Sequence, residues 1–206
     1  MGIKYQAVLF DFDGVIGSGY FYAGLKKEAP LVYNFIEENV FGSVSGKIDQ
    51  WMKGQLTWAQ VNQLIAQQTA FDEQKLYEYL VESIQQMKIE VRLLGLASQL
   101  QERGVKVALV TNNMDIFNEV TIDRHQLADF FPVIVNSCNY GLLKHENNGK
   151  LFEITLEKLQ HNSFSDILLI DDSVRATQAF QGKGGSAYTY TNYAQFEPWC
   201  KQNLVD

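Results

Sequence analysis

The chain has 206 residues, of which 46% are hydrophobic and 20% charged, and only three are proline, a composition that excludes disordered, collagen-like and low-complexity proteins. The 17 Lys and Arg residues are outnumbered by 24 Asp and Glu residues, and the formal net charge of −7 has the wrong sign for binding nucleic-acid phosphates. This length corresponds to about one and a half typical domains, so we expect one core that carries an insertion.

The first predicted element is a buried strand near the start of the chain. Residues 5–11 form an apolar run that ends in Asp11, and Asp13 and Gly14 follow directly. A buried strand of a parallel sheet has this appearance where it meets a loop. About ninety residues then separate it from the next strand-like run, far more than an ordinary connection or one crossover helix needs. We therefore expect an inserted subdomain between these two strands.

Residues 17–88 are predicted to form this insertion, a helical cap. Thr57 begins a capping box, which marks the start of a helix whose apolar face includes Val61. A second apolar stripe with helical spacing runs over residues 76–87, and a weaker third covers residues 30–38. The cap should therefore be a small bundle of helices.

The rest of the chain is predicted to return to the core. A helix over residues 91–102 ends just before Gly104. Four further strands are expected over residues 105–110, 133–135, 167–170 and 187–191. Helical patterns separate these strands, which is the βαβ signature of a parallel sheet covered by helices on both faces. We therefore predict an α/β fold with a Rossmann-like parallel sheet core, formed by residues 1–16 and 89–206, and an inserted helical cap subdomain.

Polar side chains follow several of these strands where the apolar runs stop. The second strand is followed by residues 111–113, the third by residues 136–137 and the fourth by residues 171–172. In open parallel sheets, ligands bind outside the carboxyl ends of the strands. The sequence therefore predicts a functional site at this edge.

Four carboxylates are expected at the same edge, those of Asp11, Asp13, Asp171 and Asp172. Carboxylates held close together repel each other, so either one stays protonated or a cation lies among them. Mg²⁺ is a hard cation that binds a few carboxylates and keeps some of its waters. We predict a Mg²⁺ site, although Asp172 or Ser173 could also serve simply as the N-cap of a following helix.

Four short motifs resemble, in order, those of the haloacid dehalogenase superfamily: Asp11-x-Asp13-Gly14-Val15, Thr111-Asn112, Lys144 and Asp171-Asp172. The resemblance covers nearly the whole chain, including a helical cap between the first and second motifs. Residues 51–58 and 109–113 look like the branch that contains sugar-phosphate phosphatases and the phosphatase domain of epoxide hydrolase. The resemblance implies a hydrolase of this fold with Mg²⁺ as its cofactor.

The resemblance also implies roles for the acids. Asp11 would be the nucleophile that forms an aspartyl phosphate, and Asp13 would protonate the leaving alcohol and then deprotonate the hydrolytic water. Mg²⁺ would be held by the Asp11 carboxylate, the Asp13 backbone carbonyl and Asp172. Asp171 would lie in the next layer around the metal.

Three further residues would bind the phosphoryl group. The Thr111 hydroxyl and the Asn112 backbone N–H would contact its oxygens, and Lys144 would offset the negative charge between the phosphate and the nucleophile. The third motif departs from the family pattern, because His145 replaces the customary proline and extra residues follow it. Lys150 is therefore a second candidate for the role of Lys144, which we favour for its spacing from the preceding residues.

These inferences predict an enzyme, a Mg²⁺-dependent phosphoric monoester hydrolase acting on a small phosphorylated metabolite such as a sugar phosphate. The first alternative is a 2-haloacid dehalogenase, which would need neither a metal nor an acid at position 13. A phosphomutase of the same fold is the second alternative. The third is a non-catalytic binding protein that retains the fold.

Two other patterns are interpreted as structural. Residues 182–187 match a dinucleotide-binding fingerprint as a string, but they follow a predicted helix and precede a strand, which is the reverse of the required order. We expect a turn there. Five aromatic residues of the cap are predicted to pack in its core rather than contact a substrate: Tyr20, Phe21, Tyr22, Trp51 and Trp58.

The remaining predictions concern location and partners. The first residues lack the pattern of a signal peptide, and no apolar run is long enough to span a bilayer, so we expect a cytoplasmic protein without a membrane or nucleic-acid partner. Cys138 and Cys200 lack a paired or metal-binding spacing, so we expect both to be reduced. The three histidines form no zinc motif. The oligomeric state is left open.

Overall fold

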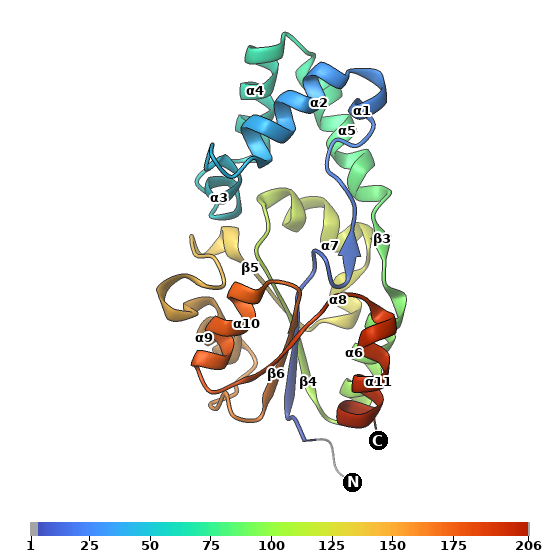
Figure 1. Cartoon of the computed structure of the whole chain (residues 1–206), viewed down its shortest axis with the longest axis vertical. Coiled ribbons are helices and arrows are strands. Elements are labelled where there is room, and N and C mark those ends of the chain that lie inside the picture. The colour runs from blue at the N-terminus through green and yellow to red at the C-terminus, as the bar shows by residue number, and fades with distance from the viewer. Residues whose placement is uncertain (1–3, 206) are drawn as a thin grey trace.

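The computed structural model describes residues 4–205, with side chains for residues 4–204. Its larger part contains five parallel strands in the order β5-β4-β1-β6-β7 (Figure 1). The strands are β1 (Ala7–Phe10), β4 (Lys106–Thr111), β5 (Val133–Asn136), β6 (Ile167–Asp171) and β7 (Ser186–Thr189). All five predicted strands are present, and the predicted α/β fold with a parallel sheet is confirmed.

Alternate residues of the central strands face two separate layers of helices. Val8 and Phe10 of β1 belong to an apolar cluster with α6 (Val91–Glu102), α8 (Leu127–Phe130) and α11 (Tyr193–Cys200). Ala7 and Leu9 belong to a second cluster with α9 (Lys150–Lys158) and α10 (Val174–Gly182). Because successive side chains of a strand point to opposite faces, a strand buried on both sides reads as one continuous apolar run.

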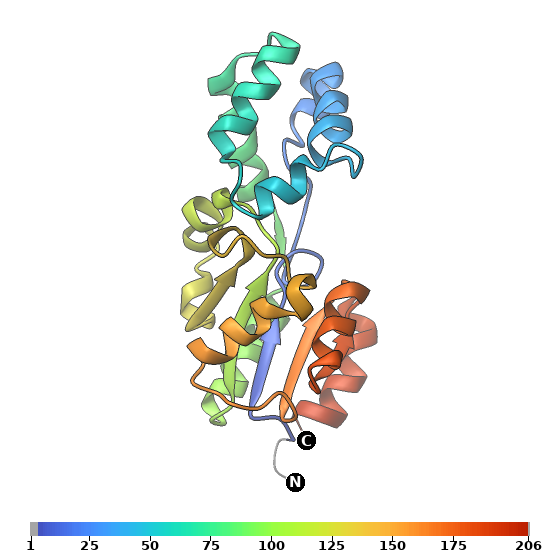
Figure 2. The same cartoon turned by 90° about the vertical axis from the view of Figure 1, so that its left-hand side faces the viewer.

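The helices within residues 17–88 lie beyond the carboxyl ends of the parallel strands (Figures 1 and 2). They are α1 (Leu25–Glu28), α2 (Pro30–Ile36), the π-helical segment η1 (Glu37–Phe41), α3 (Lys47–Met52), α4 (Trp58–Thr69) and α5 (Glu73–Gln85). The chain enters and leaves this region through two short antiparallel strands, β2 (Gly17–Ser18) and β3 (Lys88–Ile89). Residues 17–88 are called the helical insertion below, and their separate folding stays a prediction.

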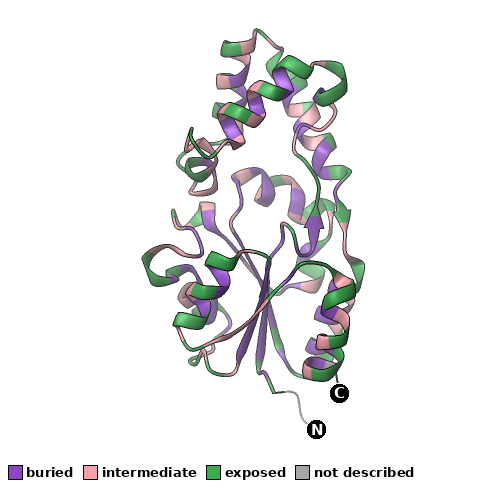
Figure 3. Cartoon of the chain, in the orientation of Figure 1, coloured by how far each residue is buried: buried purple, intermediate pink, exposed green. Residues whose placement is uncertain are grey.

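The sequence signals in the helical insertion are mostly confirmed. Thr57 caps α4 in a capping box with Gln60, and the apolar stripe of α5 is buried. Trp51 and Tyr22 are fully buried. Figure 3 shows buried segments, in purple, along the helices of the insertion. The prediction is wrong for Tyr20, which is 74% exposed. It lies in the connection between β2 and α1, whereas Tyr22 of the same connection packs inward.

Short helical turns complete the chain. They are η2 (Phe117–Thr121), α7 (Ile122–Arg124), η3 (Ser137–Asn139), η4 (Glu146–Asn148) and η5 (Lys201–Val205). The glycine-rich string at residues 182–187 joins the end of α10 to β7 and is the predicted turn, with Gly184 at φ +90°. Within the residues described, no helix combines the length and the apolar character that crossing a bilayer requires.

Candidate active site

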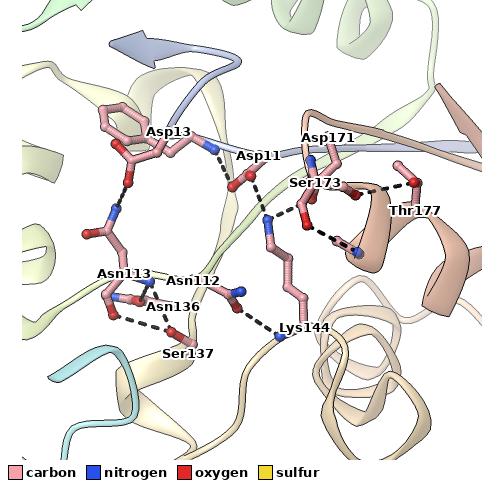
Figure 4. Close-up of polar contacts among 12 residues, drawn as sticks. Asp11, Asp13, Asn112, Asn113, Asn136, Ser137, Lys144, Asp171, Ser173 and Thr177 are labelled. Atoms are coloured by element: carbon pink, nitrogen blue, oxygen red, sulfur yellow. Dashed lines mark hydrogen bonds and ion pairs between the residues drawn. The ribbon is translucent and has the colours of Figure 1, made fainter. Parts of the chain in front are cut away.

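Three acidic side chains gather where β1 and β6 end. Figure 4 shows two of them, Asp11 and Asp171, on either side of the Lys144 amine. Asp11 directly follows β1, Asp171 is the last residue of β6, and Asp172 comes next. One carboxylate oxygen from each acid lies within 4.8 Å of the other two. Since β1 and β6 are adjacent parallel strands, their carboxyl ends meet at one edge, and this places the acids together.

Lys144 lies between two of these acids. Its Nζ is 2.6 Å from Oδ2 of Asp11 and 2.6 Å from Oδ2 of Asp171. The residue is only 1% exposed, and a buried charge is tolerated only when it is paired. Its backbone N–H donates to Oδ1 of Asn112 at 2.8 Å, which ties the loop after β5 to the end of β4. One lysine faces three acids, so the cluster has an excess of negative charge when all three are ionised.

Asp171 and Asp172 differ in what their oxygens contact. The second oxygen of Asp171 accepts a hydrogen bond from the backbone N–H of Ser173 at 2.8 Å. Ser173 itself provides the N-cap of α10. The carboxylate of Asp172, by contrast, accepts no hydrogen bond from any other residue that the structure describes. Both oxygens of Asp171 are therefore occupied by contacts within the protein, whereas the oxygens of Asp172 are available for a ligand.

The loop after β1 passes directly beside Asp172 at Gly14. This glycine has φ +76°, a conformation that side chains rarely adopt, and a Cβ built on it would lie 2.2 Å from Oδ2 of Asp172. Glycine is needed both for the turn and for the close approach of the two loops.

Thr111 contributes a buried hydroxyl at the end of β4. Its side chain is fully buried, and Oγ1 has no hydrogen-bond partner among the described residues. Buried polar groups are normally satisfied, so an unpaired one calls for an explanation. Since β4 pairs with β1, this hydroxyl lies at the edge of the sheet that also carries Asp11.

Asp13 lies outside the three-acid cluster and contacts Asn113. The Nδ2 of Asn113 donates to Oδ2 of Asp13 at 2.7 Å, and Figure 4 shows this contact on the far side of Asp11 from Lys144. The two acids of the first motif therefore have different surroundings. Asp11 is ion-paired with a lysine, and Asp13 is bonded to an amide.

Burial and mutual repulsion raise the pKa of these acids. Burial raises the pKa of Asp11 to about 8 against the attraction of Lys144, and the nearby charges of Asp171 and Asp13 add to the rise. Burial raises the pKa of Asp13 to about 6, with repulsion from Asp172. Burial opposes the charge of Lys144, but its two carboxylate partners raise its pKa above the usual range, so it stays cationic.

A cavity of about 550 Å³ lies next to Asp13. The core contributes Asp13 and Gly14 to its lining, and the stem of the helical insertion contributes Tyr20, Phe21, Gln86 and Lys88. This volume is in the range of sites that bind small molecules.

The model of the haloacid dehalogenase-like hydrolase family matches residues 5–182. The chain belongs to this family. A search of curated protein sequences gives no significant match. The recognition of the fold from its four motifs is thereby confirmed.

Solved structures of haloacid dehalogenase (HAD) family proteins resemble the whole chain. A HAD family enzyme from Bacteroides thetaiotaomicron has a TM-score of 0.74 at 20% identity, over 97% of this chain and 99% of that one. A predicted HAD-like hydrolase from Porphyromonas gingivalis has a TM-score of 0.78 at 15% identity, over 98% and 99%. L-2-haloacid dehalogenase from Xanthobacter autotrophicus, with chloropropionic acid covalently bound, has a TM-score of 0.66 at 12% identity, over 98% and 84%. At these identities the likeness is one of fold.

The acids of this HAD-like chain suit a hard divalent cation. Asp11, Asp171 and Asp172 offer only oxygen donors, the ligands that Mg²⁺ prefers. Their excess negative charge and the raised pKa of Asp11 mean that a cation would stabilise the ionised cluster. The residues present therefore fit the predicted Mg²⁺.

The two candidate lysines occupy different places. Lys144 reaches the acid cluster although His145 follows it, whereas Lys150 begins α9 at the surface and pairs with Glu153. The structure thus brings together Asp11, Asp171, Asp172 and Lys144, with Asp13, Thr111 and Asn112 around them. Lys150 lies outside this group.

Sequence reasoning assigned no role to Asn113 and Ser137. Both are buried and follow the second and third core strands. Ser137 accepts a hydrogen bond from the backbone N–H of Asn113 at 3.0 Å. Their position directly after parallel strands was the available signal, but it does not show which acid Asn113 would contact.

Proposed function

We propose that this protein is a Mg²⁺-dependent phosphatase that hydrolyses a small phosphorylated metabolite through an aspartyl-phosphate intermediate. The observation that carries the proposal is the contrast between Asp11 and Asp13. One is ion-paired to a buried lysine, and the other is set apart with a pKa of about 6. Two carboxyl groups with such different partners are suited to separate roles in one reaction. Asp11 must be ionised to attack, and a cation bound beside it would lower its pKa from about 8.

In the first step, a carboxylate oxygen of Asp11 attacks phosphorus and the bond to the leaving oxygen breaks. The electron pair of that bond goes to the leaving oxygen. Asp13, with a pKa near neutrality, supplies the proton that turns the departing alkoxide into an alcohol. A cavity of about 550 Å³ beside Asp13 gives a small leaving group room on the side where the proton is delivered.

In the second step, water attacks the phosphorus of the aspartyl phosphate. Asp13, now deprotonated, accepts a proton from this water, and the phosphorus–oxygen bond to Asp11 breaks. Inorganic phosphate leaves, and both acids return to their starting state. The same residue thus serves as acid and then as base.

Lys144 and the end of β4 would bind the phosphoryl group. Lys144 carries positive charge beside the nucleophile and draws negative charge toward it. The unpaired hydroxyl of Thr111 would find its partner in a phosphoryl oxygen, together with the backbone N–H of Asn112.

The metal would be held by Asp11, the backbone carbonyl of Asp13 and Asp172, with Asp171 behind them holding Lys144 in place. When bound, Mg²⁺ would neutralise phosphoryl charge that otherwise could not approach this acid cluster. The Bacteroides HAD family enzyme was also solved in complex with magnesium and inorganic phosphate, at a TM-score of 0.66 and 19% identity. This likeness supports the proposal.

The test is hydrolysis of p-nitrophenyl phosphate before and after chelation. We expect activity with Mg²⁺, loss of activity in excess chelator and recovery when Mg²⁺ is added back. Chloride release from 2-chloropropionate is the matched assay for dehalogenation. Undiminished phosphatase activity in chelator would contradict the metal assignment, and chloride release without phosphate release would contradict the function.

A further inference from the structure

The helical insertion contacts the core in two places, through α5, whose Ile84 carbonyl lies 2.9 Å from His125 Nε2, and through residues 51–58. The side chains and backbone of residues 51–58 bond to groups that follow β4 and β5. Trp51 Nε1 and the backbone N–H of Trp58 both donate to the Asp115 carboxylate, at 2.7 Å and 3.0 Å. Lys53 forms an ion pair with Glu146. We call residues 51–58 the docking segment.

One contact of the docking segment leads toward the acids. The Ser137 hydroxyl donates to the backbone carbonyl of Met52 at 2.6 Å and accepts from the backbone N–H of Asn113 at 3.0 Å. The Asn113 carbonyl lies 3.3 Å from the same hydroxyl. A hydroxyl has a single proton, so it bonds either to Met52 or to Asn113, and the shorter contact is the one to Met52. Ser137 is completely buried, which leaves no water to replace a lost partner.

Asn113 carries this contact to Asp13. Its Oδ1 accepts from the backbone N–H of Met114 at 3.0 Å, which fixes the amide with Nδ2 toward Asp13. Nδ2 then donates to Oδ2 of Asp13 at 2.7 Å. Because Oδ2 of Asp13 accepts this hydrogen bond, a proton bound to Oδ2 would face the Asn113 N–H. The proton of a protonated Asp13 therefore resides on its other oxygen, Oδ1.

We propose that Ser137 and Asn113 are positioning residues that couple the docking of residues 51–58 to the orientation of Asp13. This inference rests on the proposed function, in which Asp13 is the general acid. When Met52 contacts Ser137, the hydroxyl proton points away from Asn113, and the backbone and amide of Asn113 hold Asp13 in one orientation. When the docking segment moves away, the Ser137 hydroxyl proton turns to the Asn113 carbonyl. This new hydrogen bond changes the position of the Asn113 backbone, and with it the orientation of the Asn113 amide that contacts Asp13.

The ratio of kcat values on substrates with different leaving groups tests this coupling. A purely structural role of Ser137 would lower kcat equally on both substrates and leave the ratio unchanged. An alkoxide needs the proton of Asp13, whereas p-nitrophenolate leaves with little help. A misdirected Asp13 should therefore lower kcat on an alkyl phosphate while p-nitrophenyl phosphate is affected much less. General acid catalysis contributes about 10²–10⁴-fold, and a partial loss of tenfold or more is expected.

The experiment compares Ser137→Ala with Ser83→Ala. Ser83 is a matched control in the insertion, since its buried hydroxyl also donates to a backbone carbonyl at 2.6 Å and accepts a backbone N–H at 3.1 Å. With Mg²⁺, Ser137→Ala should lower kcat on glycerol 3-phosphate about tenfold or more relative to p-nitrophenyl phosphate. Ser83→Ala should leave that ratio unchanged.

A second variant keeps the test decisive if Ser137→Ala folds poorly. Lys53→Met removes only the ion pair with Glu146 and should shift the same ratio in the same direction. Combined with Ser137→Ala, it should add little further, because coupled residues give non-additive effects. Additive effects, or an equal loss on both substrates, would overturn the coupling while leaving the proposed function intact. A wild-type protein inactive on both phosphates would overturn both.

Discussion

The carboxyl edge of the sheet and the helical insertion are both well packed, but they bury different kinds of group. The edge of the sheet buries Asp11, Asp171 and Lys144, with charges that only partly balance. The insertion buries apolar side chains, such as Leu76 and Leu80, and directs its polar groups toward the core at residues 51–58. The comparison teaches that the ends of the strands bury charged groups at some cost in stability, whereas the insertion is held together by apolar burial.

This comparison predicts that substitutions at the edge of the sheet mainly change activity. The largest effect should come from Asp11→Asn, which removes the proposed nucleophile and should abolish turnover on every phosphate ester. The folded structure should persist, because Lys144 keeps Asp171 as a partner. Steady-state assays with two leaving groups, alongside thermal unfolding, check this. Residual turnover on either substrate would mean that another group attacks phosphorus.

The second largest effect should separate the two lysines. Lys144→Ala should lower kcat on the order of a hundredfold or more, as losing one preorganised electrostatic contact does. Lys150→Ala is the control, because its side chain is exposed and pairs only with Glu153, and it should be nearly silent. Parallel kinetic measurements on the two variants decide the matter. The opposite ranking would transfer the role to Lys150.

The adjacent acids should differ in what they support. Asp172→Ala should weaken Mg²⁺ binding by about tenfold or more, since its oxygens are not engaged by other described residues. Asp171→Ala should instead reduce the free energy of unfolding, because the buried Lys144 then keeps one carboxylate partner, Asp11, instead of two, and the Ser173 N–H loses its acceptor. Calorimetric Mg²⁺ titration and denaturant unfolding measure the two quantities. Equal changes in both would show that the acids share one role.

The smallest effect should come from the surface of the insertion. Trp58 Nε1 donates to Glu119 at 2.9 Å in an exposed position, and Trp58→Phe removes this bond while keeping an aromatic ring against Tyr77. The loss in unfolding free energy should be about 1 kcal/mol or less. Activity on p-nitrophenyl phosphate should not change. A large drop in kcat would show that the insertion takes part directly in the chemistry.

The sequence reveals the sheet and the acids because both depend on local patterns. Apolar runs that stop in Asp11 and Asp171 give the strands, and parallel topology brings their ends to one edge. Lys144 is placed by a resemblance of motifs rather than by its surroundings. The contact of Asn113 with Asp13 joins residues 100 positions apart, and that of Asp115 with Trp58 joins residues 57 positions apart, so no local pattern contains them.

The buried Thr111 hydroxyl implies that this protein has not reached its highest attainable stability. Burying a hydroxyl without a hydrogen-bond partner lowers the free energy of unfolding by about 1–3 kcal/mol. Valine has nearly the same shape without the hydroxyl, so it would relieve this penalty in the free protein and remove the ligand that we propose for the phosphoryl group. Under the proposed function, selection for heat resistance and selection for turnover would favour different residues at position 111.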